Sequence, residues 1–348
     1  MFANTFFLKK IEILLYIITC FGLSCSEKSP EPLLNDNTPY ILTIPDGFPI
    51  PDIPENNLLT ETRIQLGKKL FYDPILSRDS TISCASCHLQ SYAFTDQQAI
   101  SIGIDNKLGF RNAPSLANVA YHNSFLKDGG VPTLALQVIV PIEDENEMDF
   151  SIVAAVNRLQ NNKTYRELIR QAYNSEPSPF TLSRAIAAFE RTLISGNSRF
   201  DRYFYQNDSL ALSSSEIEGM LVFFSTKAQC TYCHSGFNFT NNAFENNGLY
   251  ESYTDIGRKR ITQVNSDEGK FKVPSLRNIA VTAPYMHNGS LATLDAVLDH
   301  YANKGSNHPN KSPLINNIAL NKEEKEGIIL FLHSLTDSTF LNNPKHKR

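Results

Sequence analysis

The sequence contains no tryptophan, has no excess of positive charge and has only six cysteines. Its net charge is −4 and its isoelectric point about 6.1, a balance that argues against a nucleic-acid partner. The apolar run at residues 13–23 is shorter than the roughly 20 residues that a membrane-spanning helix needs. Four of the six cysteines lie in two copies of one pentapeptide, which is the most informative feature of the chain.

This pentapeptide is C-A-S-C-H at residues 84–88 and C-T-Y-C-H at residues 230–234. C-x-x-C-H is the attachment signature of c-type haem, in which both thiols bond to the porphyrin and the histidine binds the iron. The pattern predicts two covalently bound haems, attached through Cys84, Cys87, Cys230 and Cys233, with His88 and His234 as iron ligands. A zinc site and a thioredoxin-like redox pair are the alternatives, but neither explains a histidine directly after both motifs.

The N-terminus indicates export. Lys9 and Lys10 precede the apolar run, which has the length of a signal-peptide core. The sequence G-L-S-C at residues 22–25 predicts a lipoprotein signal over residues 1–25, with Cys25 as the acylated first residue of a periplasmic, lipid-anchored protein; simple cleavage to a soluble periplasmic protein is the alternative. Cys20 would be discarded with the signal, so no thiol is left for a disulfide. Residues 26–48, rich in Pro, Asn and Ser, predict a flexible tether.

An internal repeat predicts two similar halves. Residues 113–134 align without a gap on residues 273–294, from the P-S-L-x-N segment to a Thr-Leu helix start, and the two C-x-x-C-H motifs are separated by a similar offset. The prediction is an N-terminal haem domain at residues 49–200 and a C-terminal haem domain at residues 201–340, because turn-forming residues break the helical pattern near 195–212.

The hydrophobic pattern predicts a mainly α protein. Ser213 and Glu216 form a capping box before apolar residues at helical spacing. Further helices are expected at about residues 61–71, from Thr181, and at about residues 322–335. No stretch has several strands at hairpin spacing, so two tandem cytochrome c-like domains are the expected architecture.

Several segments resemble the bacterial di-haem cytochrome c peroxidases, a superfamily that includes MauG. The resemblance extends from about residue 58 to 335 and rests on residues 66–74, 84–88, 110–115, 137–148, 189–196 and 282–289. It implies that the haem at His88 reacts with peroxide and that the haem at His234 accepts electrons from outside. It also implies that Gln137 and Glu147 form the catalytic pair beside the first haem, where a buried carboxylate can move a proton between the peroxide oxygens. Taken without the resemblance, Glu147 belongs to a solvated acidic run.

Two positions depart from the peroxidase pattern. Where many members have a histidine that caps the resting first haem, this chain has Ile104, which cannot bind iron; the next histidine, His122, aligns elsewhere. The first haem is therefore expected to be open. Where the family usually has a tryptophan between the haems, this chain has Lys127, which leaves Phe125 and Tyr121 as candidates for the electron route.

The resemblance also suggests further metal ligands. The resemblance places the sixth ligand of the second haem at Tyr301, and His300 and Met286 are the competing ligands. Alternatively, Tyr301 is a hydrophobic-core residue that binds no iron. Asn112, Thr282 and Pro284 match an inter-haem calcium site of oxygen ligands.

The function expected from all this is reduction of hydrogen peroxide to water with electrons from a small cytochrome c or copper protein. A MauG-like oxidase of a protein substrate is the first alternative, and a non-catalytic di-haem electron carrier or sensor is the second. No nucleic-acid partner is expected, and a membrane is expected only through the lipid anchor. A second copy of the chain is a further expected partner, in a possible homodimer.

Overall fold

A computed structural model describes residues 38–348. The described residues are mainly helical, as the sequence predicts, and the only named strands among them are β1 (Phe244–Glu245) and β2 (Phe271–Lys272), which pair antiparallel. The α-helices are α1 (Glu61–Tyr72), α2 (Cys84–Cys87), α3 (Leu134–Gln137), α4 (Ile139–Glu143), α5 (Ile152–Asn161), α6 (Lys163–Tyr173), α7 (Pro179–Glu190), α8 (Arg199–Tyr205), α9 (Ser214–Phe223), α10 (Lys259–Thr262), α11 (Leu294–Ala302), α12 (Lys322–Ser334) and α13 (Ser338–Leu341).

Local capping explains where the long helices begin. The predicted capping box of α9 is present, with the Ser213 side chain accepting from the Glu216 backbone N–H. Helix α7 starts at Pro179, two residues earlier than predicted, because Ser178 and Thr181 form a second capping box and proline is favoured in the first turn. No helix among residues 38–348 is both long and apolar enough to cross a membrane.

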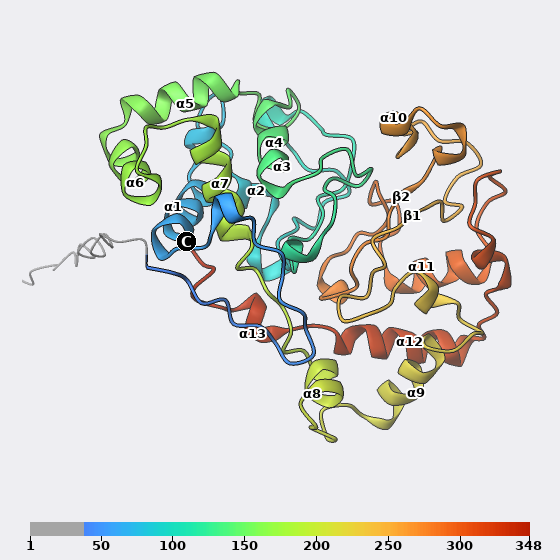
Figure 1. Cartoon of the computed structure of the whole chain (residues 1–348). Coiled ribbons are helices and arrows are strands. Elements are labelled where there is room, and N and C mark those ends of the chain that lie inside the picture. The colour runs from blue at the N-terminus through green and yellow to red at the C-terminus, as the bar shows by residue number, and fades with distance from the viewer. Residues whose placement is uncertain (1–37) are drawn as a thin grey trace, which may run out of the picture. The chain divides into compact units, whose positions relative to one another are not determined.

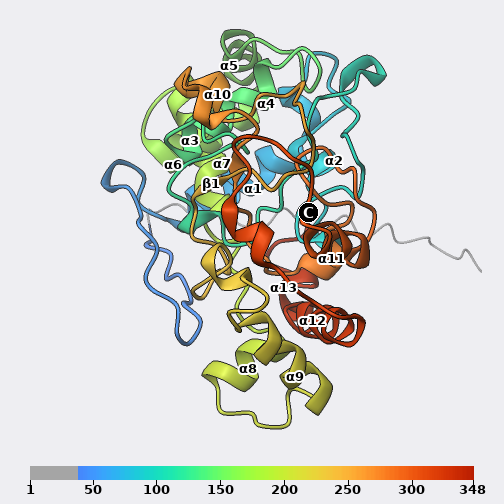
Figure 2. The ribbon, with the colours of Figure 1, turned by 90° about the vertical axis from the view of Figure 1, so that its right-hand side faces the viewer.

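Each half of the described chain contains one pair of closely crossing helices (Figures 1 and 2). Helix α1 crosses α7 at Gly67, where a Cβ atom would lie 1.9 Å from the Ala185 carbonyl oxygen. Helix α9 crosses α12 at Gly219, where a Cβ would lie 1.8 Å from the Gly327 carbonyl oxygen. Only glycine allows such a close approach, because it lacks a Cβ atom, so both helix crossings depend on these glycines. Each pair lies in its own hydrophobic core.

The internal repeat has a structural counterpart. Thr133 and Thr293 cap α3 and α11 through their side chains. Asn118 and Asn278 both adopt φ of +60°. The Asn118 backbone N–H donates to the Leu193 carbonyl oxygen (2.8 Å), shortly after α7, and the Asn278 backbone N–H donates to the Leu335 carbonyl oxygen (3.1 Å), directly after α12. These equivalent contacts support two similar halves, while the boundary between residues 200 and 201 stays a prediction.

A buried polar junction joins the halves. The Asn118 side chain accepts from Ser195 N (2.8 Å), and Asn278 Nδ2 donates to Ser195 Oγ (2.9 Å). Asp337 accepts from the backbone N–H groups of Gly196 (3.0 Å) and Asn197 (2.9 Å). The predicted break at residues 195–198 therefore lies between α7 and α8 and is held by hydrogen bonds.

The ends of the described chain pack on it. Tyr40 N donates to Leu59 O (3.0 Å), and the buried Phe48 contacts Phe237 with ring centroids 4.6 Å apart. Residues 39–48 of the predicted tether therefore contact the folded unit through the Tyr40 backbone and the Phe48 ring, whereas Ile41 is exposed, and the flexibility of the tether stays a prediction. The signal at residues 1–25, including Cys25, and the start of the tether lie outside the described residues.

The C-terminal segment returns to the first half, where it ends near α1 (Figure 1). Gln90 Nε2 donates to the carbonyls of Phe340 (3.0 Å) and Asn343 (2.9 Å), and Tyr72 Oη donates to His346 O (2.6 Å). Phe340 belongs to the core that α1 and α7 form. The sequence did not signal this return of residues 338–348.

Candidate active site

The first C-x-x-C-H motif forms the short helix α2, with His88 as its C-cap. His88 Nδ1 lies 2.6 Å from the Phe94 carbonyl oxygen, so this nitrogen donates. Burial lowers the pKa of His88, which keeps the imidazole neutral. A neutral imidazole whose second nitrogen is anchored is the form that binds metal.

The second motif repeats this arrangement. His234 Nδ1 lies 3.0 Å from the Phe239 carbonyl oxygen, and burial lowers the pKa of His234 in the same way. Cys84, Cys87, Cys230 and Cys233 are all free thiols. The residues of both motifs therefore suit covalent haem and an iron–histidine bond.

The zinc alternative lacks the ligands that it requires. A structural zinc site uses four Cys or His ligands. Across residues 38–348, no three His, Cys, Asp or Glu side chains are grouped to hold a metal ion, and the two motifs lie in different hydrophobic regions.

A cavity of about 350 Å³ lies at the second motif and extends to residues of the first half. Cys230, Cys233 and His234 line it, together with Gln137 and Lys127. Its size is in the range of cofactor pockets, and the residues that line it are up to 220 positions apart in the chain.

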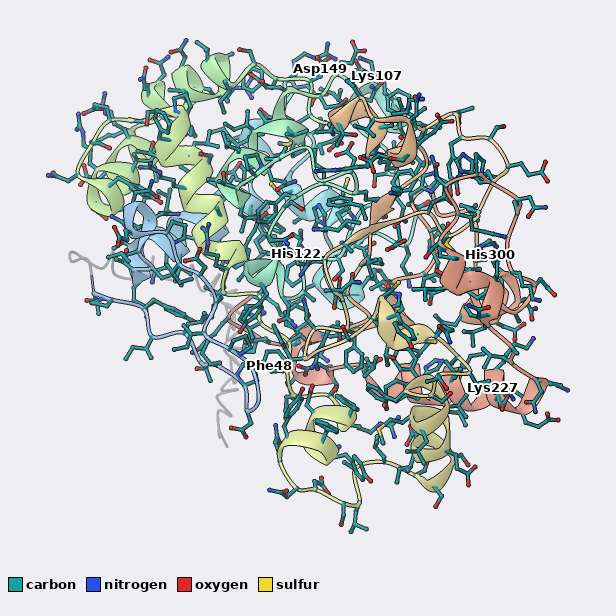
Figure 3. All side chains as sticks on the ribbon, turned by 45° about the vertical axis from the view of Figure 1, so that its right-hand side comes forward. Phe48, Lys107, His122, Asp149, Lys227 and His300 are labelled. Atoms are coloured by element: carbon teal, nitrogen blue, oxygen red, sulfur yellow. The ribbon has the colours of Figure 1, made fainter. Side chains whose placement is uncertain are left out.

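Three candidates for the sixth ligand of the second iron differ in position. Tyr301 and Met286 line the cavity, whereas His300 does not, and His300 Nε2 donates to the Asn247 carbonyl oxygen at 3.0 Å (Figure 3). Asn247 also hydrogen-bonds Tyr301 and donates through Nδ2 to the Met286 sulfur at 3.0 Å. Asn247 thus links all three candidates, and no sequence motif pointed to it.

Glu147 lies near the first motif, in the turn after α4. Its negative charge raises the pKa of the Cys84 and Cys87 thiols, which places the carboxylate near both. Part of Glu147 is exposed to solvent, but burial among the surrounding protein atoms and, to a lesser degree, the nearby Asp144 charge raise the pKa of its carboxyl group to about 7. Such a carboxyl group can give and take a proton near neutral pH, unlike a freely solvated one.

Gln137 is placed differently from Glu147. It ends α3 and lines the cavity that contains Cys230, Cys233 and His234. The structure therefore associates the two predicted catalytic residues with different parts of the molecule: Glu147 with the first motif and Gln137 with the space between the motifs.

The loop that carries Ile104 packs directly on Glu147. The Ile104 backbone N–H donates to the Glu147 carbonyl oxygen at 2.8 Å, and the Ile104 side chain is 1 % exposed. A Cβ at Gly103 would lie 1.9 Å from the Asn146 carbonyl oxygen. Lys107 pairs with Asp149 at 3.7 Å and so ties the loop to the turn of Glu147 (Figure 3). The sequence did not reveal this contact.

Tyr121, His122 and Phe125 lie between the two motifs in the sequence and have aromatic or cationic neighbours in the structure. Tyr121 packs against Phe237 with centroids 4.8 Å apart, while Phe125 lines the cavity. His122 also lines the cavity, where its Nδ1 accepts from Lys272 Nζ at 3.2 Å. Burial and the Lys272 charge lower the pKa of His122 to about 3, so it is neutral.

The three predicted calcium ligands, Asn112, Thr282 and Pro284, line one cavity. Asn112 Nδ2 donates to Gln98 O at 2.7 Å, which leaves its side-chain oxygen as an acceptor. This oxygen and backbone carbonyls suit a hard cation, so the residues are compatible with the calcium prediction.

Comparisons with known proteins agree on one relationship. The family model described as "Di-haem cytochrome c peroxidase" matches residues 61–209. The methylamine utilization protein MauG of Methylophilus methylotrophus is 34% identical over 84% of this chain and 86% of its own length. The cytochrome c551 peroxidase of Nitrosomonas europaea is 33% identical over 81% of each chain.

One solved structure is similar along almost the whole described chain. It is a MauG-like protein associated with microbial copper homeostasis, with a TM-score of 0.83 and 35% identity. The match covers 88% of this chain and 99% of that chain, so it includes both C-x-x-C-H motifs.

Proposed function

This chain belongs to the family of di-haem cytochrome c peroxidases and MauG, and we propose that it reduces hydrogen peroxide to water. The electrons would come from a small cytochrome c or copper protein. In this proposal Cys84 and Cys87 hold the peroxidatic haem, and Cys230 and Cys233 hold the haem that receives electrons, each in its own tandem domain. The haem iron supplies the electrons that cleave the O–O bond.

The position and protonation of Glu147 carry this proposal. Cleavage of peroxide requires removal of a proton from one oxygen and its delivery to the oxygen that leaves. Glu147 lies near the first motif, and its pKa of about 7 allows its carboxylate to accept this proton and its acid form to donate it. The overall reaction, H₂O₂ with two electrons and two protons giving two waters, balances with Glu147 regenerated.

The contact with residues 103 and 104 supports the role of Glu147. The backbone of Glu147 is held by Ile104 N–H, and the loop side chain is a buried aliphatic group that has no lone pair for iron. We propose that the iron position facing Glu147 is open in the resting, fully oxidised protein.

Replacement of Glu147 tests the proposal. Glu147→Gln should keep both haems attached and lower steady-state peroxide turnover at least about 100-fold, equivalent to about 2.7 kcal/mol in the barrier. Glu145→Gln removes a charge from the same acidic run and is the matched control, because Glu145 is exposed and is not a neighbour that raises the pKa of Glu147. Near-wild-type turnover of Glu147→Gln with reduced cytochrome c would contradict the proposed role.

A MauG-like oxidation of a protein substrate is the second candidate. One observation favours it: Tyr301 lines the cavity at the second motif. A tyrosinate ligand stabilises oxidised iron, which suits an oxidase. The two candidates differ in one assay: the peroxidase consumes peroxide in proportion to reduced cytochrome c, whereas the oxidase does not oxidise this donor at a comparable rate.

We further propose that calcium binds at Asn112, Thr282 and Pro284 and that the protein is exported and lipid-anchored through Cys25. A homodimer is part of the same proposal. Membrane fractionation of the wild type and of Cys25→Ser tests the anchor, because only the wild type should sediment with membranes. Metal analysis after dialysis against a chelator tests the calcium site.

A further inference from the structure

Lys127 and Lys272 bring two ammonium groups to one cavity. Both line the cavity at the second motif, and Lys272 N donates to the Lys127 carbonyl oxygen at 2.7 Å, which fixes the two residues side by side. Burial, the Arg111 charge and the Lys272 charge lower the pKa of Lys127 to about 8. Burial lowers the pKa of Lys272 to about 8 as well. All of these influences on the two lysines disfavour their positive charge.

The nearby carboxylates are already engaged elsewhere. Asp128 accepts from Arg111 Nη1 (2.8 Å) and Arg260 Nη2 (2.6 Å), and Asp255 accepts from Arg111 Nε (2.6 Å) and Nη2 (2.8 Å). Glu245 is the exception: it lines the cavity, but its charge acts on Cys233 and is not among the influences on the pKa of either lysine.

The lysines themselves have only neutral partners. Lys272 Nζ donates to the Ser124 carbonyl oxygen (2.7 Å) and to the neutral His122 (Figure 3). The Lys127 ammonium has no hydrogen bond or ion pair with any of residues 38–348. Two half-buried cations that face one cavity without a counter-charge are unfavourable unless an anion joins them.

We propose that Lys127 and Lys272 bind carboxylate groups in this cavity, namely the propionates of the haem attached at Cys230 and Cys233. The inference rests on the haem assignment of the proposed function. Lys127 cannot relay an electron as an aromatic ring does, and its role is instead to position and neutralise the carboxylates of the cofactor.

A positive charge held beside the haem carboxylates favours the reduced iron, since it offsets the negative charge near the metal. Loss of one such charge should therefore make the second haem harder to reduce. The expected effect of losing one such partly solvated charge is a fall of roughly tenfold or less in the ratio of reduced to oxidised second haem.

Spectroelectrochemical titration of the purified holoprotein tests the inference. At the wild-type midpoint, Lys127→Met should lower the ratio of reduced to oxidised second haem several-fold, Lys127→Arg should stay near wild type, and the first haem should change less. Lys163→Met, an exposed lysine on α6, is the matched charge control and should change neither haem. Lys272→Met provides a second test if Lys127→Met does not fold.

The outcomes separate the sources of the carboxylate. An unchanged ratio in both Lys127→Met and Lys272→Met would overturn the inference. A saturable shift of the wild-type ratio by added acetate, reversed by dialysis, would assign the lysines to a free small carboxylate and overturn the propionate assignment; insensitivity to acetate supports it. A wild-type polypeptide whose mass lacks two haems would instead contradict the proposed function, independently of the lysines.

Discussion

Replacing Asp144 by asparagine should move the pH dependence of the peroxide reaction. Burial is the larger cause and Asp144 the smaller cause of the rise in the pKa of Glu147 from 4.5 to about 7. Asparagine removes the charge but retains a side-chain oxygen, and the Asp144 side chain accepts a hydrogen bond from Asn146 N at 2.8 Å. The substitution therefore changes the electrostatics of Glu147 while it preserves the turn.

The magnitude follows from the pKa. Glu147 must be ionised to accept the peroxide proton, so the rate falls as the pH drops below about 7. At pH 5 about 1% of the group is ionised, which predicts a rate about 100-fold below the plateau. Because Asp144 is the smaller cause, its loss should lower the pKa by about one unit or less, so Asp144→Asn should lose between about tenfold and 100-fold at pH 5, less than the wild type loses.

The assay is the second-order rate of reaction with hydrogen peroxide, followed by stopped-flow absorbance between pH 5 and 9. Glu145→Gln removes a charge of the same run and should leave the profile unchanged, while Glu147→Gln should show no acid limb governed by this carboxyl. An Asp144→Asn profile that superimposes on the wild type, or an acid limb that persists in Glu147→Gln, would refute the reasoning.

Three further predictions concern other parts of the site. Tyr301→Phe should change the absorption spectrum of the second haem and raise its potential while the first haem is unaffected; an unchanged spectrum would favour Met286, which lines the same cavity. Because Ile104 offers no lone pair, the first haem of the oxidised protein should give a high-spin ferric EPR signal and react with peroxide without prior reduction, and low-spin signals for both haems with a lag abolished by pre-reduction would contradict this. Burial raises the pKa of Glu190 to about 8, so its contribution to stability is present below pH 4.5 and is lost as the pH rises through 8. Glu190→Gln should remove this loss, on the order of 4 kcal/mol at high pH in denaturant unfolding, and identical pH profiles of the two proteins would disprove it.

Glu190 illustrates what sequence reasoning missed. It sits inside an amphipathic helix pattern, and it is 4% exposed with Oε2 buried and without a hydrogen-bond partner. Its charge also raises the pKa of Cys84. A carboxylate at this position could have been expected to face water, and only the packing of α7 against α1 shows that it does not.

The features that depend on neighbours in the chain were predictable. C-x-x-C-H indicated the haem chemistry because the attachment needs two thiols and one histidine at short, fixed spacing. Helix starts followed from capping residues such as Ser213, and the repeat at residues 113–134 and 273–294 predicted similar contacts in both halves. The departures at Ile104 and Lys127 were also visible, because they are single substitutions within recognisable segments.

What depends on residues far apart in the chain was decided by the tertiary structure. The sequence alone determined the helical class, indicated the likeness of the two halves and predicts the haem attachment residues, since these follow from local spacing and capping. It did not determine that Asn247 links Tyr301, Met286 and His300, or that Lys127 and Lys272 face one cavity without a counter-charge. These residues are about 40 to 150 positions apart in the chain, so only the packing of helices and loops brings them together. Their burial then shifts their pKa values.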